Sequence, residues 1–438
     1  MAWKTLTYSG WGRMKQATGP VARPERVSSL ARALEDRPGP AIGNCRSYGD
    51  ACLANDAPAI QTTRLDRILG FDEETGILEA EAGLRVGEIA RIFAPKGWLP
   101  AVMPGTGFAT VGGCIANDVH GKNHHSVGSF GQHVVELTLM QGGVPKTVTP
   151  KKKNTKLFEA TIGGLGQTGV IASAKLQLLA CKGDVMMVTE RRIDGFDEFI
   201  AALDASNSPY SVGWIDATAR GDDLGRGILE EGETGYGLVP AKKSSKSVPF
   251  DAPGFTLSAP IVKAFNTAYF RRVPAAGRTL VKPIQDFFFP LDRIHDWNRL
   301  YGKAGFIQFQ CVVPPDKAEA LKTILKEIAK AGLASPLAVL KRMGPGRAGL
   351  MSFPMEGYTL AVDFKNTGLA KSLIGRLEQM TADAEGRVYL AKDATLNAKH
   401  MPQMYPELPK FVAYVNKLDP DGAFETDLTR RLQIRSAS

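Results

Sequence analysis

The densest group of residues that could do chemistry lies in residues 103–133. Seven glycines fall within this stretch, as do four of the six histidines of the chain. The glycines are Gly105, Gly107, Gly112, Gly113, Gly121, Gly128 and Gly131. Glycine at this density lets the backbone approach a ligand closely and direct its N–H groups at an anion. The pattern therefore predicts a loop that binds an anionic group.

The histidines of this stretch are His120, His124, His125 and His133. A metal site is disfavoured, because no pair has the HExxH spacing and the nearest carboxylate is Asp118. Taken alone, any one of these histidines would be interpreted as a structural residue that caps or hydrogen-bonds within a glycine-rich loop. The clustering favours a cofactor cradle, with backbone N–H groups on a diphosphate and with His120 and Lys122 at the reacting end. We expect no metal site.

Other nucleotide-binding motifs fit the chain poorly. Residues 164–169 match GxGxxG, the dinucleotide fingerprint, which must follow a strand and open a helix. Residues 170–178 instead alternate as a strand does, so a Rossmann NAD site is rejected. The sequence also contains no GxxxxGK[ST] phosphate loop and no GxSxG nucleophile elbow.

Composition indicates a globular protein. The 438 residues are 44% hydrophobic and 23% charged, and this length allows two or three domains. The net charge of +9 is a mild bias toward anionic partners and does not indicate nucleic-acid binding. The largest local cluster of positive charge is at residues 151–153. Because no aromatic residue lies within it to stack on a base, we expect this segment to be a solvated loop.

The number and spacing of the cysteines and the hydropathy of the chain indicate in which cellular compartment the protein is expected. The five cysteines are odd in number and form no CxxC, which argues against a disulfide framework or a cysteine zinc site. The N-terminus lacks the apolar core of a signal peptide, and no apolar run approaches the ~20 residues of a membrane-spanning helix. We expect a cytoplasmic protein whose membrane contact is at most peripheral.

The elements that must position these residues are short and mixed. Residues 25–36 have helical spacing, residues 77–82 alternate as a strand, and residues 83–94 look like a turn into a helix. After residue 183 the patterns lengthen, with strands at 211–216, 306–313 and 358–364 and a helix at 315–331. This mixture predicts an α+β fold. Residues 219–285, rich in Gly, Pro, Ser and Lys, show little regular pattern and predict a flexible insert that acts as a lid.

Four motifs carry a specific resemblance. They are Arg46-Ser-Tyr-Gly-Asp50, Pro104-Gly-Thr106, Thr110-Val-Gly-Gly113, and His120-Gly-Lys-Asn-His-His125 with the following Gly128-Ser-Phe-Gly131. Together they resemble the FAD-binding half of the vanillyl-alcohol oxidase/p-cresol methylhydroxylase superfamily. Similarity to its branch that oxidises lipid-linked ribose continues through Trp214, residues 306–310, residues 341–346, Tyr389-Leu-Ala-Lys392-Asp393, residues 405–406 and residues 419–432. It covers nearly the whole chain except residues 219–285.

The resemblance implies two domains. An FAD-binding domain of the PCMH type would span residues 1–183, a sheet-containing substrate domain residues 184–411, and residues 412–438 would return to the FAD domain. FAD would lie extended, its diphosphate on backbone N–H groups of residues 43–50 and 105–113. The implied cofactor-binding residues are Gly43, Asn44, Cys45, Arg46, Ser47, Tyr48, Gly49, Asp50, Gly105, Thr110, Val111, Gly112, Gly113, Asn117, Asp118, Val119, His120, Ile171 and Tyr414.

Covalent attachment of the flavin is not expected. Relatives with a histidine linkage often carry that histidine where Ser47 stands here. Cys114, which follows Gly113, is better understood as a small packing residue. The expected cofactor is therefore non-covalent FAD.

The resemblance also implies catalytic and substrate-binding residues. Lys417 and His120 would be catalytic, with Lys417 as the proton acceptor or alkoxide stabiliser. Lys122, Gln310, Lys341 and Trp214 would bind the substrate. A lysine with an ordinary pKa of ~10.4 is a poor base at neutral pH, so burial or cationic neighbours must lower that pKa. Lys122 and Lys341 would be such neighbours.

The activity implied is oxidation of a secondary sugar hydroxyl to a ketone by hydride transfer to flavin N5. The expected substrate is the 2′-hydroxyl of a polyprenylphosphoryl-β-D-ribose, in the ribose-to-arabinose epimerisation that supplies cell-wall arabinan. Expected partners are an NAD(P)H-dependent short-chain reductase and quinone or oxygen as electron acceptor. The alternative is a sugar-lactone or alditol oxidase of the same superfamily that acts on a soluble sugar. A non-enzymatic metal or nucleotide sensor would contain no flavin.

Overall fold

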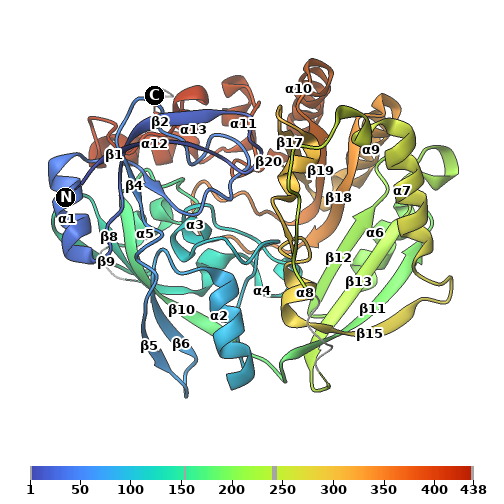
Figure 1. Cartoon of the computed structure of the whole chain (residues 1–438), viewed down its shortest axis with the longest axis horizontal. Helices are drawn as coiled ribbons and strands as arrows, with labels where there is room; N and C mark the ends of the chain where they lie inside the picture. The colour runs from blue at the N-terminus through green and yellow to red at the C-terminus, as the bar shows by residue number, and fades with distance from the viewer. Residues whose placement is uncertain (1, 152–153, 239–243, 436–438) are drawn as a thin grey trace.

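The computed structural model describes residues 2–151, 154–238 and 244–435. Figure 1 shows two halves side by side, with both chain ends in the left half and the largest sheet in the right half. Helices and strands are mixed along the whole described chain, as the sequence predicts.

Two sheets build the left half. The first has the order β1-β2-β4-β3, with β1 Lys4–Ser9, β2 Gln16–Ala22, β3 Ala41–Ile42 and β4 Ala59–Gln61. The second has the order β5-β6-β10-β8-β9, with β7 paired to β10. Its strands are β5 Ile68–Asp72, β6 Ile77–Glu81, β7 Trp98–Pro100, β8 Val134–Met140, β9 Pro145–Val148 and β10 Val170–Ala180. The accompanying helices are α1 Val27–Asp36, α2 Val86–Phe93, α3 Val111–Ala116, α4 His124–Val127 and α5 Thr155–Thr161.

Several local predictions are confirmed in this half. The expected helix at 25–36 is α1, the strand at 77–82 is β6, and the turn into a helix at 83–94 leads to α2. Strand β10 begins at Val170, directly after the last glycine of the GxGxxG match. No helix opens on those glycines, so the rejection of a Rossmann site is confirmed.

An antiparallel eight-stranded sheet forms the right half, in the order β15-β11-β13-β12-β18-β19-β17-β20. Its strands are β11 Val185–Ile193, β12 Tyr210–Ile215, β13 Gly227–Gly235, β15 Arg278–Pro283, β17 Phe306–Val313, β18 Ala334–Met343, β19 Gly357–Lys365 and β20 Arg387–Val388. Its helices are α6 Phe196–Ala205, α7 Ala259–Arg271, α8 Ile284–Phe288, α9 Ala318–Ala331 and α10 Gly368–Asp383. A short parallel pair, β14 Lys246–Ser247 and β16 Ile294–His295, lies outside this sheet.

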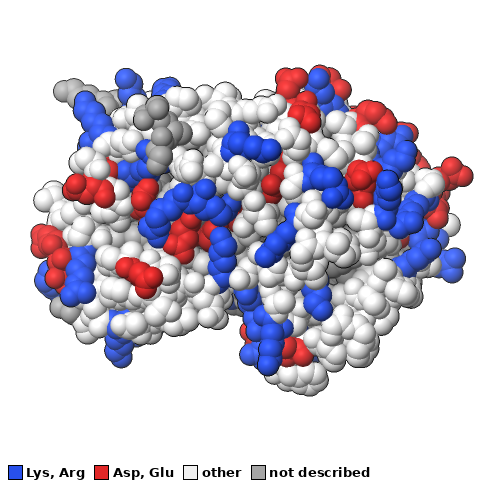
Figure 2. Space-filling model, turned by 90° about the horizontal axis from the view of Figure 1, so that it is seen from above, with Lys and Arg blue, Asp and Glu red and all other residues white. Residues whose placement is uncertain are grey.

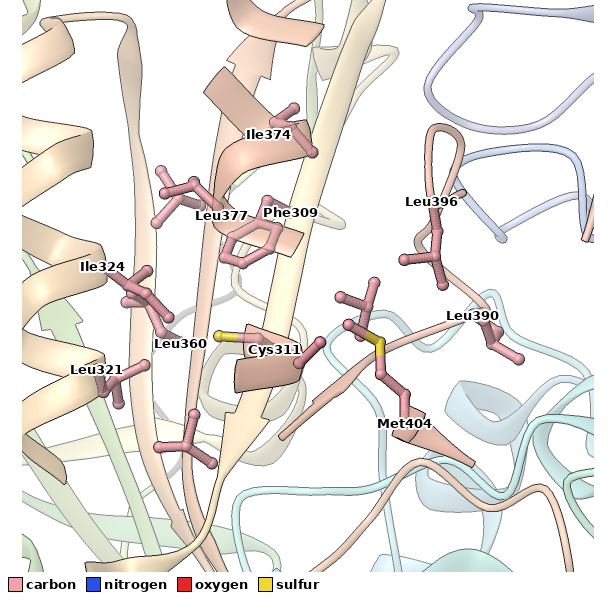
Figure 3. Close-up of a cluster of buried hydrophobic side chains, with 14 of the residues drawn as sticks. Phe309, Cys311, Leu321, Ile324, Leu360, Ile374, Leu377, Leu390, Leu396 and Met404 are labelled. Carbon is pink, nitrogen blue, oxygen red and sulfur yellow. The ribbon is translucent and has the colours of Figure 1, made fainter. Parts of the chain in front are cut away.

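Alternation along the strands gives the large sheet two different faces. Successive side chains of a strand point to opposite sides. On β17, Ile307, Phe309 and Cys311 join the largest hydrophobic cluster, together with side chains of α6, α9 and α10. Figure 3 shows part of this cluster, with Phe309 and Cys311 between α9 and α10 side chains and residues near Leu390. The alternate residues Gln308 and Gln310 lie on the other face.

The expectation of an irregular insert at 219–285 is wrong. Strands β13 and β15 both pair with β11 in the large sheet, and α7 belongs to the same segment. The sequence of β13 is rich in Gly and Glu, so it lacks the apolar alternation by which a strand is recognised. Its place is set by pairing with β11 and β12, which sequence periodicity does not report. Residues 239–243 lie outside the described residues.

The end of the chain returns to the left half. Helices α11 Met401–Met404, α12 Leu408–Leu418 and α13 Asp427–Arg431 lie there in Figure 1. The Arg431 guanidinium binds both carboxylate oxygens of buried Asp50 at 2.8 Å, and Lys15 binds the same carboxylate at 2.7 Å. These contacts fix the loop that precedes Asp50 to the last helix of the described chain.

Charged side chains of both signs are mixed on the face of the molecule seen from above, where Figure 2 shows Lys and Arg interspersed with Asp and Glu. Among the helices of the described residues, none is both long and apolar enough to cross a membrane.

Candidate active site

A cavity of about 760 Å³ lies between the two halves. One wall is made of loops from the left half, at residues 43–48, 103–122 and 165–171. The opposite wall is made of β12, β17, β18 and β19, closed by segments near residues 290–297 and 389–392. This volume is in the range of small-molecule and cofactor sites.

The loop wall presents backbone amides. Between β3 and Tyr48, the N–H groups of residues 43–47 donate no hydrogen bond to any atom of the described chain. The carbonyls of Ser47 and Tyr48 are instead held, by the N–H groups of Trp11 and Gly12. At Gly43 a β-carbon would lie 2.5 Å from Thr110 Oγ1, so only glycine allows the two loops to approach this closely. The loop is thus fixed by its carbonyls, and its amides remain available to a ligand.

Two buried polar atoms of this wall also lack a partner within the described residues. They are Nε of Arg46 and Oδ1 of Asn117, and both residues line the cavity. The Arg46 guanidinium lies 4.1 Å from the Trp11 ring centroid and 4.6 Å from that of Phe108, without a carboxylate partner. Unpaired buried polar atoms are uncommon in proteins and point to an absent ligand. A free cation, free amides and a close glycine approach fit the diphosphate of FAD.

The strand wall carries the expected polar side chains. Alternate residues of neighbouring strands face the cavity, among them Trp214 on β12, Gln310 on β17 and Lys341 on β18. Gln310 Nε2 lies 3.0 Å from His120 Nε2, and Lys341 Nζ lies 3.1 Å from His120 Nδ1. His120 is therefore bridged between two strands of the opposite half.

Burial shifts the pKa values of these groups. Desolvation, aided by the charge of Lys341, holds the pKa of His120 well below its usual range, so the imidazole is neutral. Desolvation, aided by the charge of Lys122, lowers the pKa of Lys341 to about 7. Desolvation also lowers the pKa of Lys122 to about 8. At neutral pH both forms of Lys341 are present: the unprotonated amine accepts a hydrogen bond from Nδ1–H of His120, and the protonated amine donates one to Nδ1.

Lys392 lies at the same site, although the sequence analysis did not assign it a role. It lines the cavity beside Tyr48, with Nζ 3.2 Å from the centroid of the Tyr48 ring. Desolvation lowers the pKa of Lys392 to about 7; the charge of Asp363 opposes this shift and that of Lys341 adds to it. Asp363, on β19, is buried at the cavity wall, where Gln308 and Tyr301 donate hydrogen bonds to it at 2.5 and 3.2 Å.

Most of the predicted site residues line this cavity. They are Gly43, Asn44, Cys45, Arg46, Ser47, Tyr48, Gly105, Thr110, Gly112, Gly113, Asn117, Val119, His120, Lys122, Ile171, Trp214, Gln310 and Lys341. The structure does not bring Gly49, Asp50, Val111, Asp118, Tyr414 or Lys417 to the cavity wall. These six residues therefore do not contact a ligand in the cavity directly.

Lys417 and Tyr414 are corrections to the sequence analysis. Both lie on α12, whose buried face consists of Leu408, Phe411, Val412 and Val415. Lys417 is in the last turn of this helix and is exposed, while Tyr414 packs partly against the hydrophobic clusters. Neither side chain is among those that line the cavity. Lys417 is therefore not in a position to accept a proton from a substrate.

Asp50 and Asp118 support the loops without lining the cavity. Asp50 binds Arg431 and Lys15, as described above. Asp118 is fully buried and accepts hydrogen bonds from the Ser129 and Ser352 hydroxyls at 2.9 and 2.5 Å and from the Gly131 amide at 2.8 Å. It thereby ties the histidine-rich segment to the chain near residue 352. Both carboxylates position the site indirectly.

A sequence signal for Lys392 was present. Tyr389-Leu-Ala-Lys392-Asp393 is one of the segments that carry the family resemblance, and Tyr389 packs against His120 with ring centroids 5.4 Å apart. Gln308 lies in the segment 306–310, which also carries the resemblance, whereas Asp363 and Asp292 had no such signal. The Asp292 carboxylate accepts hydrogen bonds from Thr106 Oγ1 and from the Gly107 amide, both at 2.7 Å, and so joins the two sides of the cavity.

Comparison with known proteins gives matches along the whole chain. A family model described as an FAD binding domain matches residues 21–143, and one described as D-arabinono-1,4-lactone oxidase matches residues 361–432. The first range contains most of the loop wall. The second contains Asp363 and Lys392 of the opposite wall.

Three relatives illustrate the range of similarity. The decaprenylphosphoryl-β-D-ribose oxidase of Mycolicibacterium smegmatis is 34% identical, with 98% of each chain aligned. An uncharacterised protein of Streptomyces coelicolor is 31% identical over 79% of this chain and 99% of its own. The L-gulono-1,4-lactone dehydrogenase of Mycobacterium tuberculosis is 21% identical over 97% of this chain and 98% of its own.

Proposed function

Because this chain belongs to the family of FAD-dependent oxidoreductases that includes the decaprenylphosphoryl-β-D-ribose oxidase of M. smegmatis, we propose that it oxidises the 2′-hydroxyl of a polyprenylphosphoryl-β-D-ribose. The product is the corresponding 2′-ketone. The FAD is held without a covalent bond. Quinone or oxygen takes the electrons, and an NAD(P)H-dependent short-chain reductase completes the epimerisation.

One observation carries this proposal. Three lysines, Lys122, Lys341 and Lys392, face one region of the cavity around His120, and within the described residues none of them forms an ion pair. Glu230 and Asp363 also line the cavity, but neither forms an ion pair with these lysines. In their protonated forms, Lys122 and Lys341 favour an anionic substrate. A sugar that carries a phosphate supplies that charge, whereas a neutral lactone does not.

Individual residues of the cavity have separate roles in the proposed reaction. When bound, FAD supplies the two-electron acceptor that takes the hydride from the carbinol carbon. Lys392, unprotonated above pH 7, accepts the proton of the 2′-hydroxyl and takes the role first expected of Lys417. Neutral His120, held by Gln310 and Lys341, orients the sugar. Lys122 and Lys341 attract the phosphate.

The walls of the site suit a long apolar chain beyond the sugar. Trp214 and Tyr269 pack with ring centroids 4.7 Å apart and both line the cavity, as do Phe288 and Leu337. These apolar surfaces would contact the first isoprene units. A lipid-linked substrate also requires the protein to work at a membrane surface, so we include peripheral membrane contact in the proposal.

A second candidate is oxidation of a soluble sugar lactone. The match of residues 361–432 to a lactone oxidase model favours it. Both candidates use the same cavity, but they differ in their need for a phosphate. The lysines around His120 have no function in binding a neutral lactone.

The test is an anaerobic titration of the purified, FAD-loaded protein, followed by its absorbance spectrum. A short-chain polyprenylphosphoryl ribose is expected to bleach the flavin band. L-gulono-1,4-lactone and free ribose, the matched controls, are expected to leave it unchanged. Bleaching by the lactone alone would establish the second candidate, and a band that neither compound bleaches would reject both.

A further inference from the structure

Exposed apolar side chains are concentrated in one part of the described chain. Its four most exposed aromatics are Tyr236, Phe250, Phe255 and Phe265, with exposed fractions of 84, 69, 66 and 50%. Four exposed aliphatic residues, Leu238, Ile261, Ile294 and Leu300, lie in the same segment of residues 236–300. Contiguous exposed apolar surface marks an interaction site.

Helix α7 organises part of this surface into a face. Val262 and Asn266 are buried toward the sheet, and Tyr269 packs on Trp214 from the same side. Ile261, Phe265 and Ala268, spaced by four and three residues, are exposed on the adjacent face of the helix, where Phe265 stacks on Tyr269. Residues with this spacing share one face of a helix. The 3₁₀ turn η4 (Gly254–Leu257), which contacts α7, adds Phe255.

The segment that carries this face has charged side chains of one sign. Residues 252–285 contain no Asp or Glu but five Lys and Arg residues. Three of these, Arg272, Arg278 and Lys282, are held by the carboxylate of Glu190. Lys263 and Arg271 lie on α7, are exposed, and form no ion pair with any described residue. Exposed apolar side chains on a helix that also carries unpaired cations are typical of a helix that lies on an anionic lipid surface.

The face borders the substrate end of the cavity. Tyr269 of α7 lines the cavity, and Phe265, one turn earlier, stacks on Tyr269 with ring centroids 5.9 Å apart while half of its surface stays exposed. Figure 1 shows α7 on the outer side of the right half, with β12 and β18 behind it. A bilayer in contact with the outer side of α7 would therefore lie next to the cavity.

We propose that Phe255, Ile261, Phe265 and Ala268, with Lys263 and Arg271, form a docking patch for an anionic lipid bilayer. Docked in this way, the protein would receive the sugar headgroup in the cavity while the lipid chain stays in the membrane. The lipid-linked substrate rests on the proposed function, whereas the docking itself does not. A second copy of the chain is a poorer occupant, because a self-complementary contact through this face brings Lys263 and Arg271 close to their own counterparts.

The test is co-sedimentation of the FAD-loaded protein with vesicles of phosphatidylcholine, with or without phosphatidylglycerol. The double variant Phe255→Ser, Phe265→Ser is expected to lose at least tenfold in affinity for the anionic vesicles. Lys263→Gln and Arg271→Gln are each expected to lose about fivefold on anionic vesicles and nothing on neutral ones. Leu369→Ser, which changes an exposed apolar residue (72% exposed) on α10, is the matched control and should bind as the parent does.

Two further readouts separate this proposal from the others. Turnover of a short-chain, dispersed substrate should be the same in the double variant and the parent, which shows that the variant is folded and active. The proposal is overturned if the parent does not sediment with anionic vesicles, or if the double variant still sediments equally well. It is also overturned if the parent is a dimer that the double variant dissociates. Vesicle binding without ribose oxidation would reject the proposed function and leave the docking patch intact.

Discussion

The two walls of the cavity are built in opposite ways. The loop wall offers backbone amides and glycines, and the Arg46 guanidinium of this wall stacks on aromatic rings. The strand wall offers long side chains that alternation places on one face of a sheet. There, Lys341 has a pKa lowered to about 7, and Asp363 a pKa raised above its usual range, chiefly by desolvation.

The two walls therefore have different functions, which are anion binding and proton transfer. Backbone amides have no pKa near neutrality, so the loop wall can bind an anion equally well over a wide pH range. Burial of lysines on a rigid sheet lowers their pKa values toward neutrality. A lysine with such a pKa can accept a proton from an alcohol at neutral pH. We therefore expect variants of the loop wall to change cofactor affinity, and variants of the strand wall and its neighbour Lys392 to change turnover.

The largest effect is expected at Lys392. Lys392→Met should slow flavin reduction by the substrate by about 10²- to 10⁴-fold, because it removes the proton acceptor. The FAD content of the protein should not change. The measurement is anaerobic stopped-flow absorbance at saturating substrate. Lys417→Met, at an exposed position on α12, is the matched control and should reduce its flavin at the parent rate; a large loss there would restore the sequence-based assignment.

The next largest effect is expected on the loop wall. Arg46→Met should weaken FAD binding about ten- to a hundredfold, because a charge-assisted contact to the diphosphate is lost. Titration of the apoprotein with FAD, followed by flavin fluorescence, measures this. Arg85 lies on the Phe108 ring at 5.9 Å but is exposed and does not line the cavity, so Arg85→Met is the control. If Arg46→Met instead lowered turnover at saturating FAD, that result would contradict the assignment of cofactor binding to the loop wall and of turnover to the strand wall.

A smaller effect tests the electrostatics of the strand wall. The neutral amine of Lys392 is the reactive form, so flavin reduction should rise as the pH passes through about 7. Lys341→Met removes a cation that lowers the pKa of Lys392, so the midpoint should move up. Asp363→Asn removes a carboxylate that raises that pKa, so the midpoint should move down. We expect shifts of about one pH unit. Shifts of the same sign in both variants would contradict this account, whatever the absolute rates.

The smallest effect concerns the attachment of the flavin. Cys114 is fully buried in α3, and burial raises the pKa of its thiol above the ordinary value. A protonated thiol is a poor nucleophile toward flavin. Acid precipitation should therefore release all of the FAD into the supernatant, and Cys114→Ala should give the same result. Flavin that stays with the precipitated parent but not with Cys114→Ala would show a cysteinyl link.

The loop wall could be predicted from the sequence because its function needs local features. A dense run of glycines and the Arg46-Ser-Tyr-Gly-Asp50 motif are each contained within a few consecutive residues. The strands with strong apolar alternation, such as β17 and β19, were predictable for the same reason. Each of these signals reports a property of its own segment.

The strand wall could be predicted only in part. The reactivity of Lys392 depends on Tyr48, Lys341 and Asp363, which are far from it in sequence. The family resemblance assigned the role of proton acceptor to Lys417, and only the structure shows that this residue is exposed on α12 and does not line the cavity. Strand β13 was missed because its partners, rather than its own composition, make it a strand. Burial and pairing between distant segments are the information that the sequence alone does not display.

The ion pair between Asp50 and Arg431 has a consequence for the order of events during synthesis. The two residues are 381 positions apart, so at ~5–20 residues per second a ribosome adds Arg431 roughly 20–75 s after Asp50. Until then the segment of residues 43–50 has its contacts with Trp11, Gly12 and Lys15 but lacks the ion pair between Asp50 and Arg431. The nascent chain therefore carries an incomplete cradle, and we expect FAD to be loaded only after the polypeptide leaves the ribosome.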